Sequence, residues 1–332
     1  MARIEKKKDV VIVGLGWTGS IAGMELAAEG LEIVALERGG DQNTVPEFKY
    51  PNQIDELTYG VRLKNMQHPR QATVTVRRDD NEIALPYRSM GSFLPANGVG
   101  GAGTHWNGLL WRPQPEEIKL RSYVKEKWGE SIIPEGMNLM DYPVSYDELE
   151  PFFTQFDEVA GVSGKAGNLK GQIQAGGNPF EGWRSKEYPM PALGTTYDSS
   201  KFAATAKNMG LHPFPAPAGI ASTSYVNPYG MQMAPCNFCG FCERFGCYQY
   251  SKSSPQTAVL DALKRKPNFS YRTHSEVLRV ETSADGKTAT GVTYFDAIKQ
   301  EEVFQPADLV ILSSYQLNNV HLMLVSGIGK PY

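Results

Sequence analysis

The stretch that decides the fold is DVVIVGLGWTGSIAGMELAAEGLEIVALER, residues 9–38. Residues 10–13 are β-branched and typical of a buried parallel strand, and residues 33–36 predict a second strand of the same kind. Between them, the alanine-rich residues 21–29 predict the crossover helix. The pattern therefore indicates a βαβ unit at the start of an α/β fold.

Three glycines follow the first predicted strand at the spacing GxGxxG. Gly14 permits a tight turn, Gly16 lets the backbone approach a pyrophosphate, and Gly19 lets the helix pack close to the strand. Glu37 ends the second strand, where a carboxylate can accept hydrogen bonds from ribose hydroxyls. Together these features predict dinucleotide binding rather than a structural glycine turn, but they do not separate NAD from FAD.

A second glycine segment, NGVGGAGTHWNG at residues 97–108, has five glycines in twelve positions. Each glycine costs roughly 1 kcal/mol in a helix or strand, so the segment is not expected to form either one. A flexible linker is the alternative, but His105, Trp106 and Trp111 are too bulky for it. The composition instead indicates a backbone packed against a large flat ligand.

All the cysteines of the chain lie within the cysteine segment, residues 236–247, at Cys236, Cys239, Cys242 and Cys247. This spacing lets one loop wrap its thiolates around a soft metal centre, which favours an iron–sulfur cluster. Zinc sites of four cysteines usually come as two separated pairs, and disulfides between such neighbours would be strained. A redox-active CxxC would leave two thiols over. We expect a 3Fe-4S or 4Fe-4S cluster, with three or four ligating cysteines.

The charge balance and the apolar stretches exclude two classes of partner. With 33 basic and 36 acidic side chains in 332 residues, the chain is not expected to bind nucleic acid. No apolar stretch reaches the ~20 residues that span a bilayer, so no transmembrane segment is expected. The basic residues 6–8 before the apolar residues 10–13 imitate a signal peptide, but the glycine spacing and the lack of a clean cleavage site argue against one.

The middle of the chain differs from its two ends. Residues 140–250 carry most of the prolines, which predicts an irregular insert without long helices. Residues 145–160 are the exception, because their aromatic and aliphatic side chains recur at helical spacing. After the insert, residues 277–304 alternate like the strands of a meander, and residues 309–312 are expected to return to the nucleotide-binding sheet.

These motifs, taken together, resemble the glucose–methanol–choline (GMC) oxidoreductase family. Within it, the chain is similar to the flavoprotein subunits of bacterial gluconate 2-dehydrogenases and of fructose and sorbitol dehydrogenases. The resemblance covers the whole chain in family order and rests on the two glycine motifs, on Glu37-Arg38-Gly39, and on residues 275–280, 307–312 and 322–329.

The resemblance implies a Rossmann-like FAD-binding domain of GMC type. Its first part is expected at residues 1–139 and its return at residues 251–332, with residues 140–250 as the inserted substrate and cluster region. It also implies the oxidation of a CH–OH group of a sugar, polyol or sugar acid. The cofactor-binding residues that it implies are Gly14, Gly16, Gly19, Glu37, Arg38, Gly100, Gly101, Thr104, His105, Asn107, Gly108 and Val277.

Two roles of His105 stay open at this point. Some related enzymes with a similar Thr-His-Trp triplet link a histidine covalently to the flavin, and the alternative is a histidine hydrogen-bonded near the ring. The catalytic histidine of the family lies downstream of residues 326–329, so the catalytic base is expected beyond Tyr332 and the chain resembles the N-terminal part of a longer enzyme.

The resemblance also implies partners and a location. Relatives pass electrons to a cytochrome or quinone, work with a small signal-bearing subunit and a cytochrome c subunit, and lie at the periplasmic face of the inner membrane. A cluster beside a flavin favours a dehydrogenase over an oxidase, because it can remove electrons singly. Two alternatives stay open, a non-catalytic FAD-binding fragment or assembly subunit and an NAD(P)-dependent reductase.

Overall fold

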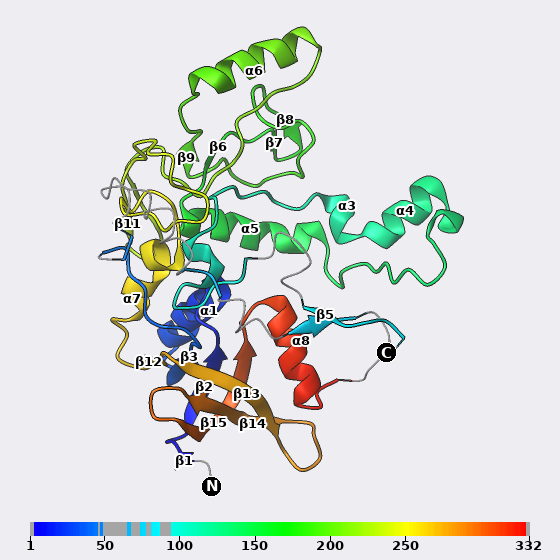
Figure 1. Ribbon diagram of the computed structural model, residues 1–332. Helices are drawn as coiled ribbons and strands as arrows, with labels where there is room; N and C mark the ends of the chain where they lie inside the picture. Colours follow the sequence, from blue (N-terminus) through cyan, green and yellow to red (C-terminus); the bar gives the residue numbers. More distant parts are fainter. Residues whose placement is uncertain are drawn as a thin grey trace. The chain divides into compact units, whose positions relative to one another are not determined.

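The computed structural model describes residues 3–45, 47–48, 65–67, 74–77, 81–86 and 94–329. The chain divides into two compact units. Unit 1 comprises Met1–Asn107, Tyr229–Met231 and Phe238–Tyr332, and unit 2 comprises Gly108–Pro228 and Gln232–Asn237. Unit 1 is thus built from both ends of the chain (Figure 1). The domain boundaries at 139/140 and 250/251 stay a prediction.

Unit 1 contains a seven-stranded sheet in the order β12, β3, β2, β15, β14, β13, with β1 paired to β15. Strands β12, β3, β2 and β15 run parallel, whereas β15, β14 and β13 form an antiparallel meander. The predicted α/β fold is confirmed, and one long strand, β15, serves both the meander and the parallel sheet. The strands are β1 (Arg3–Ile4), β2 (Lys8–Val13), β3 (Ile33–Leu36), β12 (Phe269–Arg272), β13 (Ser275–Thr282), β14 (Ala289–Asp296) and β15 (Glu301–Leu312).

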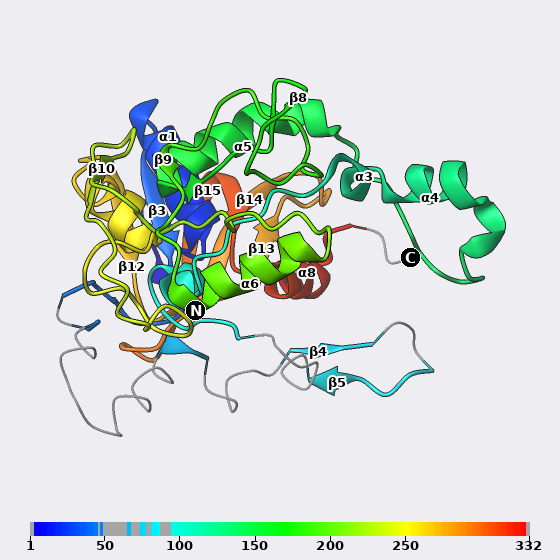
Figure 2. The same ribbon diagram turned by 90° about the horizontal axis from the view of Figure 1, so that it is seen from above.

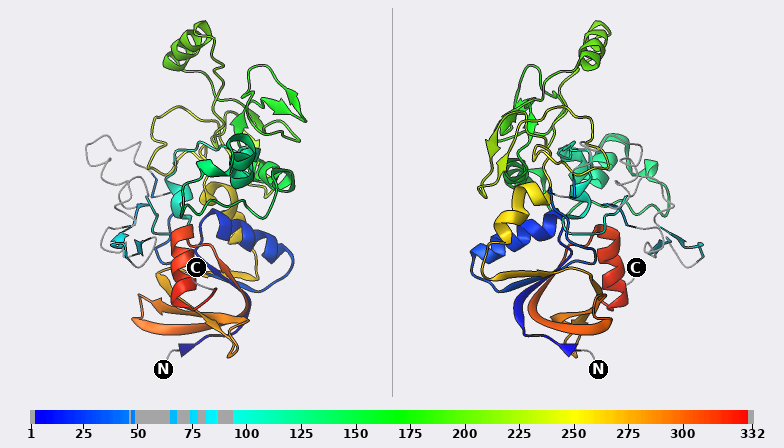
Figure 3. Two further views of the ribbon diagram at one scale, coloured as in Figure 1. Left: turned by 90° about the vertical axis from the view of Figure 1, so that its right-hand side faces the viewer. Right: turned by 60° about the vertical axis from the view of Figure 1, so that its left-hand side comes forward.

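Helices α1 (Trp17–Ala28) and α8 (Gln316–Val325) lie on opposite faces of this sheet (Figure 3). The alternation of side chains along β2 explains why both faces can be covered. Val10 and Ile12 are buried in a core with residues of α1 and β12, whereas Val11 and Val13 are buried in a second core with residues of the meander and α8. Both ends of the chain therefore contribute to each core.

The shorter elements of unit 1 surround the sheet. The strands β4 and β5 pair as a small antiparallel hairpin (Figure 2). A 3₁₀ turn falls within the second glycine segment, and a π-helical stretch precedes α7. The elements are β4 (Thr75–Val76), β5 (Leu85–Pro86), η4 (Gly101–Thr104), η6 (Gln256–Leu260) and α7 (Asp261–Leu263).

Unit 2 combines short strands with isolated helices. Its elements are α3 (Pro115–Ile118), α4 (Leu120–Trp128), η5 (Glu130–Ile132), α5 (Tyr146–Ala160), β6 (Ser163–Gly164), β7 (Asn168–Leu169), β8 (Gln172–Ile173), β9 (Met190–Pro191), α6 (Tyr197–Asn208), β10 (Tyr225–Val226) and β11 (Gln232–Met233). The predicted helix at residues 145–160 is confirmed as α5, and Ser145 begins it with a capping box to Glu148. The proline argument missed α6, which lies in the proline-free stretch between Pro191 and Pro213.

A buried ion-pair network joins α5 to the rest of unit 2. Asp157 on α5 accepts hydrogen bonds from Arg112 (2.6 Å) and Arg184 (2.5 Å). Glu150, on the same side of α5 as Asp157, accepts a hydrogen bond from Arg112 (3.1 Å). All four side chains are at most 8% exposed. Such a network contributes little net stability over an apolar core, but it fixes one geometry, because removing a single partner leaves a buried charge unpaired.

No helix among the described residues is both long enough and apolar enough to cross a membrane.

Candidate cofactor site

The first glycine loop, residues 14–19, joins β2 to α1. Gly14 has φ +93°, in the left-handed region that favours glycine, and Gly16 is the N-cap of α1. A Cβ on Gly19 would lie 2.1 Å from the Gly14 carbonyl oxygen, so only glycine lets the helix approach the turn this closely. Gly16 differs, because a Cβ there would meet nothing nearer than the Gly101 Cα, at 3.9 Å. Its lack of a side chain leaves open space at the start of α1.

Ser313 fixes the other side of this loop, and sequence reasoning missed it. It follows β15, and its hydroxyl donates to the carbonyl oxygens of Val13 (2.9 Å) and Gly14 (2.8 Å). A Cβ on Gly14 would lie 2.8 Å from the Ser313 carbonyl oxygen. The only signal in the sequence is that residues 309–312 were expected to return beside the first strand.

Glu37 joins the first glycine loop to the end of β3. Its carboxylate is 8% exposed and accepts hydrogen bonds from the backbone N–H groups of Leu15 and Gly39, each at 3.0 Å. Each carboxylate oxygen keeps a further lone pair for a ligand hydroxyl. The guanidinium of Arg38, the next residue, lies 3.9 Å from the Glu276 carboxylate on β13.

The second glycine segment contacts both of these regions. The Gly100 N–H donates to the Leu15 carbonyl (2.7 Å), and the Val99 N–H donates to the Gly40 carbonyl (3.0 Å). Gly100 and Gly101 have φ of +96° and +54°. A Cβ on Gly39 would lie 2.3 Å from the Gly98 nitrogen. The three glycine-containing stretches, distant in sequence, therefore converge at the carboxyl ends of β2 and β3, where parallel sheets bind nucleotides.

Thr104 and His105 follow in the second glycine segment, and both are buried (1% and 4% exposed). The Thr104 hydroxyl accepts a hydrogen bond from the Gln256 side chain (3.3 Å), which also donates to the Val99 carbonyl (2.8 Å). The His105 Nε2 atom is buried and has no hydrogen-bond partner among the residues that the structure describes. Burial, with a smaller contribution from the Lys252 charge, lowers the pKa of His105 to about 4, so the imidazole is neutral near pH 7.

The remaining predicted cofactor residues lie in three places. Asn107 is exposed at the end of unit 1, and Gly108 begins unit 2, where its carbonyl accepts from the Gly219 N–H (2.7 Å). Val277 lies on β13, opposite Tyr294 of β14. The Ser275 N–H donates to the Glu37 carbonyl (2.9 Å), so the start of β13 adjoins the end of β3.

The structure does not bring the cysteines together as a ligand set. Cys236 belongs to unit 2 and Cys239, Cys242 and Cys247 to unit 1, and all four are partly exposed and form no disulfide. Among the residues that the structure describes, no group of three or more cysteine, histidine, aspartate or glutamate side chains could hold a metal ion. The structure therefore gives no support to an iron–sulfur cluster, which stays a prediction from the spacing of the cysteines.

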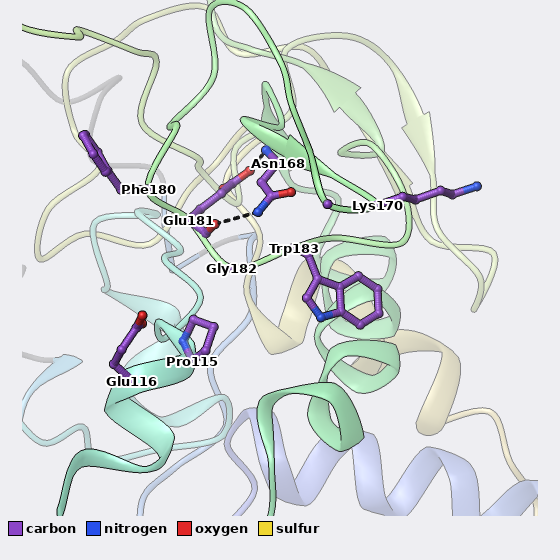
Figure 4. Close-up of a pocket in the computed structure, with 9 residues that line it drawn as sticks. Pro115, Glu116, Asn168, Lys170, Phe180, Glu181, Gly182 and Trp183 are labelled. Carbon is purple, nitrogen blue, oxygen red and sulfur yellow. Dashed lines mark hydrogen bonds between the residues drawn. The ribbon is translucent and has the colours of Figure 1, made fainter. Parts of the chain in front are cut away.

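Unit 2 has a pocket of its own, with a volume of about 660 Å³ (Figure 4). The Asn168 side chain donates to the Glu181 carbonyl (3.3 Å) at its wall, while Lys170 is directed away from Glu181. Burial raises the pKa of the Glu181 carboxyl. None of the predicted cofactor residues lines this pocket. Its lining residues are Pro115, Glu116, Asn168, Lys170, Gly171, Phe180, Glu181, Gly182 and Trp183.

The low pKa of His105 predicts a specific dependence of stability on pH. An unfolded chain binds a proton at this imidazole below about pH 6.5, whereas the folded chain excludes it down to about pH 4. The free energy of unfolding should therefore fall as the pH is lowered through this window, by about 3 kcal/mol in all. The contribution is fully present above pH 6.5.

Chemical denaturation of the wild type and of His105→Gln between pH 7.5 and 4.5 measures this effect. Other groups titrate in both proteins, so the quantity of interest is the difference between their pH slopes. We expect the wild type to lose stability more steeply on acidification. Equal slopes in the two proteins would show that His105 is not buried in a neutral form.

Comparison with known proteins confirms the resemblance. Residues 219–331 match the family described as GMC oxidoreductase. The chain is 50% identical over 330 residues to the gluconate 2-dehydrogenase flavoprotein of Pantoea cypripedii, which covers 98% of this chain and 54% of that protein. It is 26% identical over 224 residues to the fructose dehydrogenase large subunit of Gluconobacter japonicus, which covers 65% of this chain and 37% of that protein.

Solved structures share the fold at lower identity. Pyridoxine 4-oxidase from Mesorbium loti matches 97% of this chain and 52% of its own, with a TM-score of 0.53 and 15% identity. A formate oxidase variant from Aspergillus oryzae RIB40 matches 99% of this chain and 48% of its own, with a TM-score of 0.51 and 18% identity. The chain spans about half the length of these relatives. Residues 219–331 form a GMC oxidoreductase domain, and the chain as a whole is similar to flavoproteins that contain one.

Proposed function

We propose that this chain is the FAD-binding part of a dehydrogenase that oxidises a CH–OH group of a sugar, polyol or sugar acid, with gluconate as the favoured substrate. The observation that carries the proposal is the convergence of the first glycine loop, Glu37 and the second glycine segment at one edge of the parallel sheet. The 50% identity to the Pantoea flavoprotein supports the substrate class.

The described residues fit the adenosine and pyrophosphate portions of FAD. Gly16 caps α1 without a side-chain hydrogen bond, and the first turn has no acidic residue to repel an anion. The absent Gly16 side chain leaves room for the phosphates. We assign the pyrophosphate to Gly14, Gly16 and Gly19 and the ribose to Glu37, with Arg38 beside it. The backbone of Val277 on β13 is assigned to the adenine.

The second glycine segment is assigned to the flavin ring. Gly100 and Gly101 give a backbone that can approach a flat ligand closely, and Thr104, Asn107 and Gly108 are assigned to its reactive edge. Bound FAD would supply the hydride acceptor for substrate oxidation. This chain's own residues would bind and orient the cofactor, and we propose that the base that takes the hydroxyl proton lies beyond Tyr332.

Other parts of the proposal rest on the resemblance or on spacing. His105 is proposed as a covalent attachment point, supported by its neutral, unpartnered Nε2. An iron–sulfur cluster at Cys236, Cys239, Cys242 and Cys247, which would pass electrons to a cytochrome or quinone, is supported by the cysteine spacing alone. A small signal-bearing subunit, a cytochrome c subunit and a periplasmic location are proposed by resemblance only.

Two measurements on one purified sample test the covalent flavin bond and the iron–sulfur cluster. After acid precipitation, we expect yellow flavin to remain in the protein pellet, and complete release to the supernatant would contradict the covalent bond. For the cluster, we expect about three to four iron atoms and a matching sulfide content per chain. A sample with zinc or without iron would contradict the cluster.

Substitutions at two glycines separate cofactor binding from folding. A Cβ at position 16 has space in the protein but would occupy the room proposed for the pyrophosphate, so Gly16→Ala should lower FAD affinity by at least about tenfold. It should leave the melting temperature of the apoprotein unchanged. Gly19→Ala should lower both, because its Cβ would collide with the Gly14 carbonyl.

Fluorescence titration with FAD and thermal unfolding of both apoprotein variants give the comparison. If Gly16→Ala bound FAD as tightly as the wild type, the phosphates would have to lie elsewhere. Binding of NADH with similar affinity, without flavin, would favour the NAD(P)-dependent reductase instead.

A chimera tests the reaction. This chain can be fused to the remaining C-terminal portion of the Pantoea flavoprotein, since the aligned 54% of that protein is 50% identical to it. We expect the chimera to oxidise gluconate with a dye acceptor and the unfused chain to bind FAD without turnover. A chimera carrying Gly16→Ala is the matched control. A chimera that binds FAD but is inert toward sugar acids, sugars and polyols would favour the non-catalytic alternative.

A further inference from the structure

Lys252 is a buried cation whose partners are backbone carbonyls. The side chain is only 1% exposed. Its ammonium donates to the carbonyl oxygens of Trp106 (2.5 Å), Cys242 (2.6 Å) and Phe245 (2.6 Å). No carboxylate among the described residues forms an ion pair with it. Three acceptors match the three N–H donors of an ammonium group. Burial lowers the pKa of Lys252 to about 8, and the nearby thiols of Cys242, Cys247 and Cys239 act in the opposite direction.

The three carbonyls belong to two stretches of chain that the proposed function assigns to cofactors. Trp106 follows Thr104 and His105 in the second glycine segment, whereas Cys242 and Phe245 belong to the cysteine segment. Lys252 thus joins the loop assigned to the flavin to the cysteine segment through a single charged group. All four residues belong to unit 1.

Further hydrogen bonds run between the same stretches. The Arg244 N–H donates to the His105 carbonyl (2.8 Å), and the Trp106 indole N–H donates to the Ser253 carbonyl (2.7 Å). The Lys252 N–H also donates to the Cys247 sulfur (3.3 Å). Several hydrogen bonds therefore join residues 105 and 106 to residues 242–253. Among these contacts, the Lys252 side chain binds carbonyls of both the second glycine segment and the cysteine segment.

A purely structural lysine is the alternative. Burying an ammonium costs several kcal/mol before its hydrogen bonds are formed, so an apolar or amide side chain would suffice for simple packing. An amide side chain has only two N–H donors, however, and cannot serve three converging carbonyls. A charged donor at this position also places positive charge near the loop assigned to the flavin.

We propose that Lys252 is a positioning residue that fixes His105 and Trp106 of the flavin-binding loop to the cysteine segment, so that a shift of residues 242–245 changes the flavin environment. This inference rests on the proposed function, because it requires FAD at the second glycine segment. It predicts that the affinity, visible spectrum and midpoint potential of bound FAD depend on the Lys252 ammonium.

The test compares flavin properties in Lys252→Met and Lys252→Ala with those of the wild type. Hydrogen bonds from charged donors are stronger than neutral ones, so we expect FAD binding to weaken about tenfold or more, with a shifted flavin spectrum and potential. Lys287→Met, which removes an exposed lysine in the β13–β14 turn, is the matched control and should bind FAD as the wild type does.

Rescue distinguishes positioning from packing. In Lys252→Ala, added propylamine can restore the missing ammonium, whereas 1-propanol fills the same space without its charge. We expect propylamine alone to return the affinity and spectrum toward wild type. Equal rescue by 1-propanol, or wild-type flavin properties in Lys252→Met, would overturn the proposal.

A milder variant covers the case in which the lysine variants do not fold. Trp106→Phe removes the indole hydrogen bond to Ser253 while it keeps an aromatic ring beside Trp17, and it should also shift the flavin spectrum. An unchanged spectrum would contradict a positioning role for this contact region. A wild-type chain that binds no FAD would instead overturn the proposed function, which keeps the two failures distinct.

Discussion

The rest of the structure depends on one close approach, in which α1 begins directly against the turn that ends β2. A Cβ at Gly19 would lie 2.1 Å from the Gly14 carbonyl, and the same turn is closed from the other side by Ser313 at the end of β15. Both ends of the chain therefore meet at this turn, since β2 and β15 pair directly beside it. The geometry at the start of α1, to which we assign the phosphates, therefore depends on β15 as well as on the local motif.

Around this turn, buried polar groups fix the backbone of the candidate site. Glu37 ties Leu15 to Gly39, and Gln256 ties Val99 to Thr104. In each case, a side chain satisfies backbone or hydroxyl groups that would otherwise be buried without partners. This preorganisation suits a site that must hold a long cofactor in one conformation. Lys252 extends the same principle to the cysteine segment.

Much of this could be predicted from the sequence, for a physical reason. Gly14, Gly16, Gly19 and Glu37 lie within one βαβ unit, whose period and spacing are local properties of the chain. Ser313, Gln256 and Lys252 could not be found in this way, because each has a partner about 150 to 300 residues away and their types carry no signal by themselves. The cysteine spacing predicted a cluster that the arrangement of the thiols does not reproduce. The density of prolines did not predict helix α6, because a proline prevents helix formation at its own position and not in the proline-free residues between Pro191 and Pro213.

The central claim is that the first glycine loop, Glu37 and the second glycine segment form one FAD site in unit 1. Hydrogen exchange of the chain with and without FAD tests it most directly, since bound ligand protects the backbone amides that it contacts or stabilises. The account predicts new protection at residues 14–19 and 97–104 together. Protection confined to the pocket of unit 2, around residues 168–183, would contradict it.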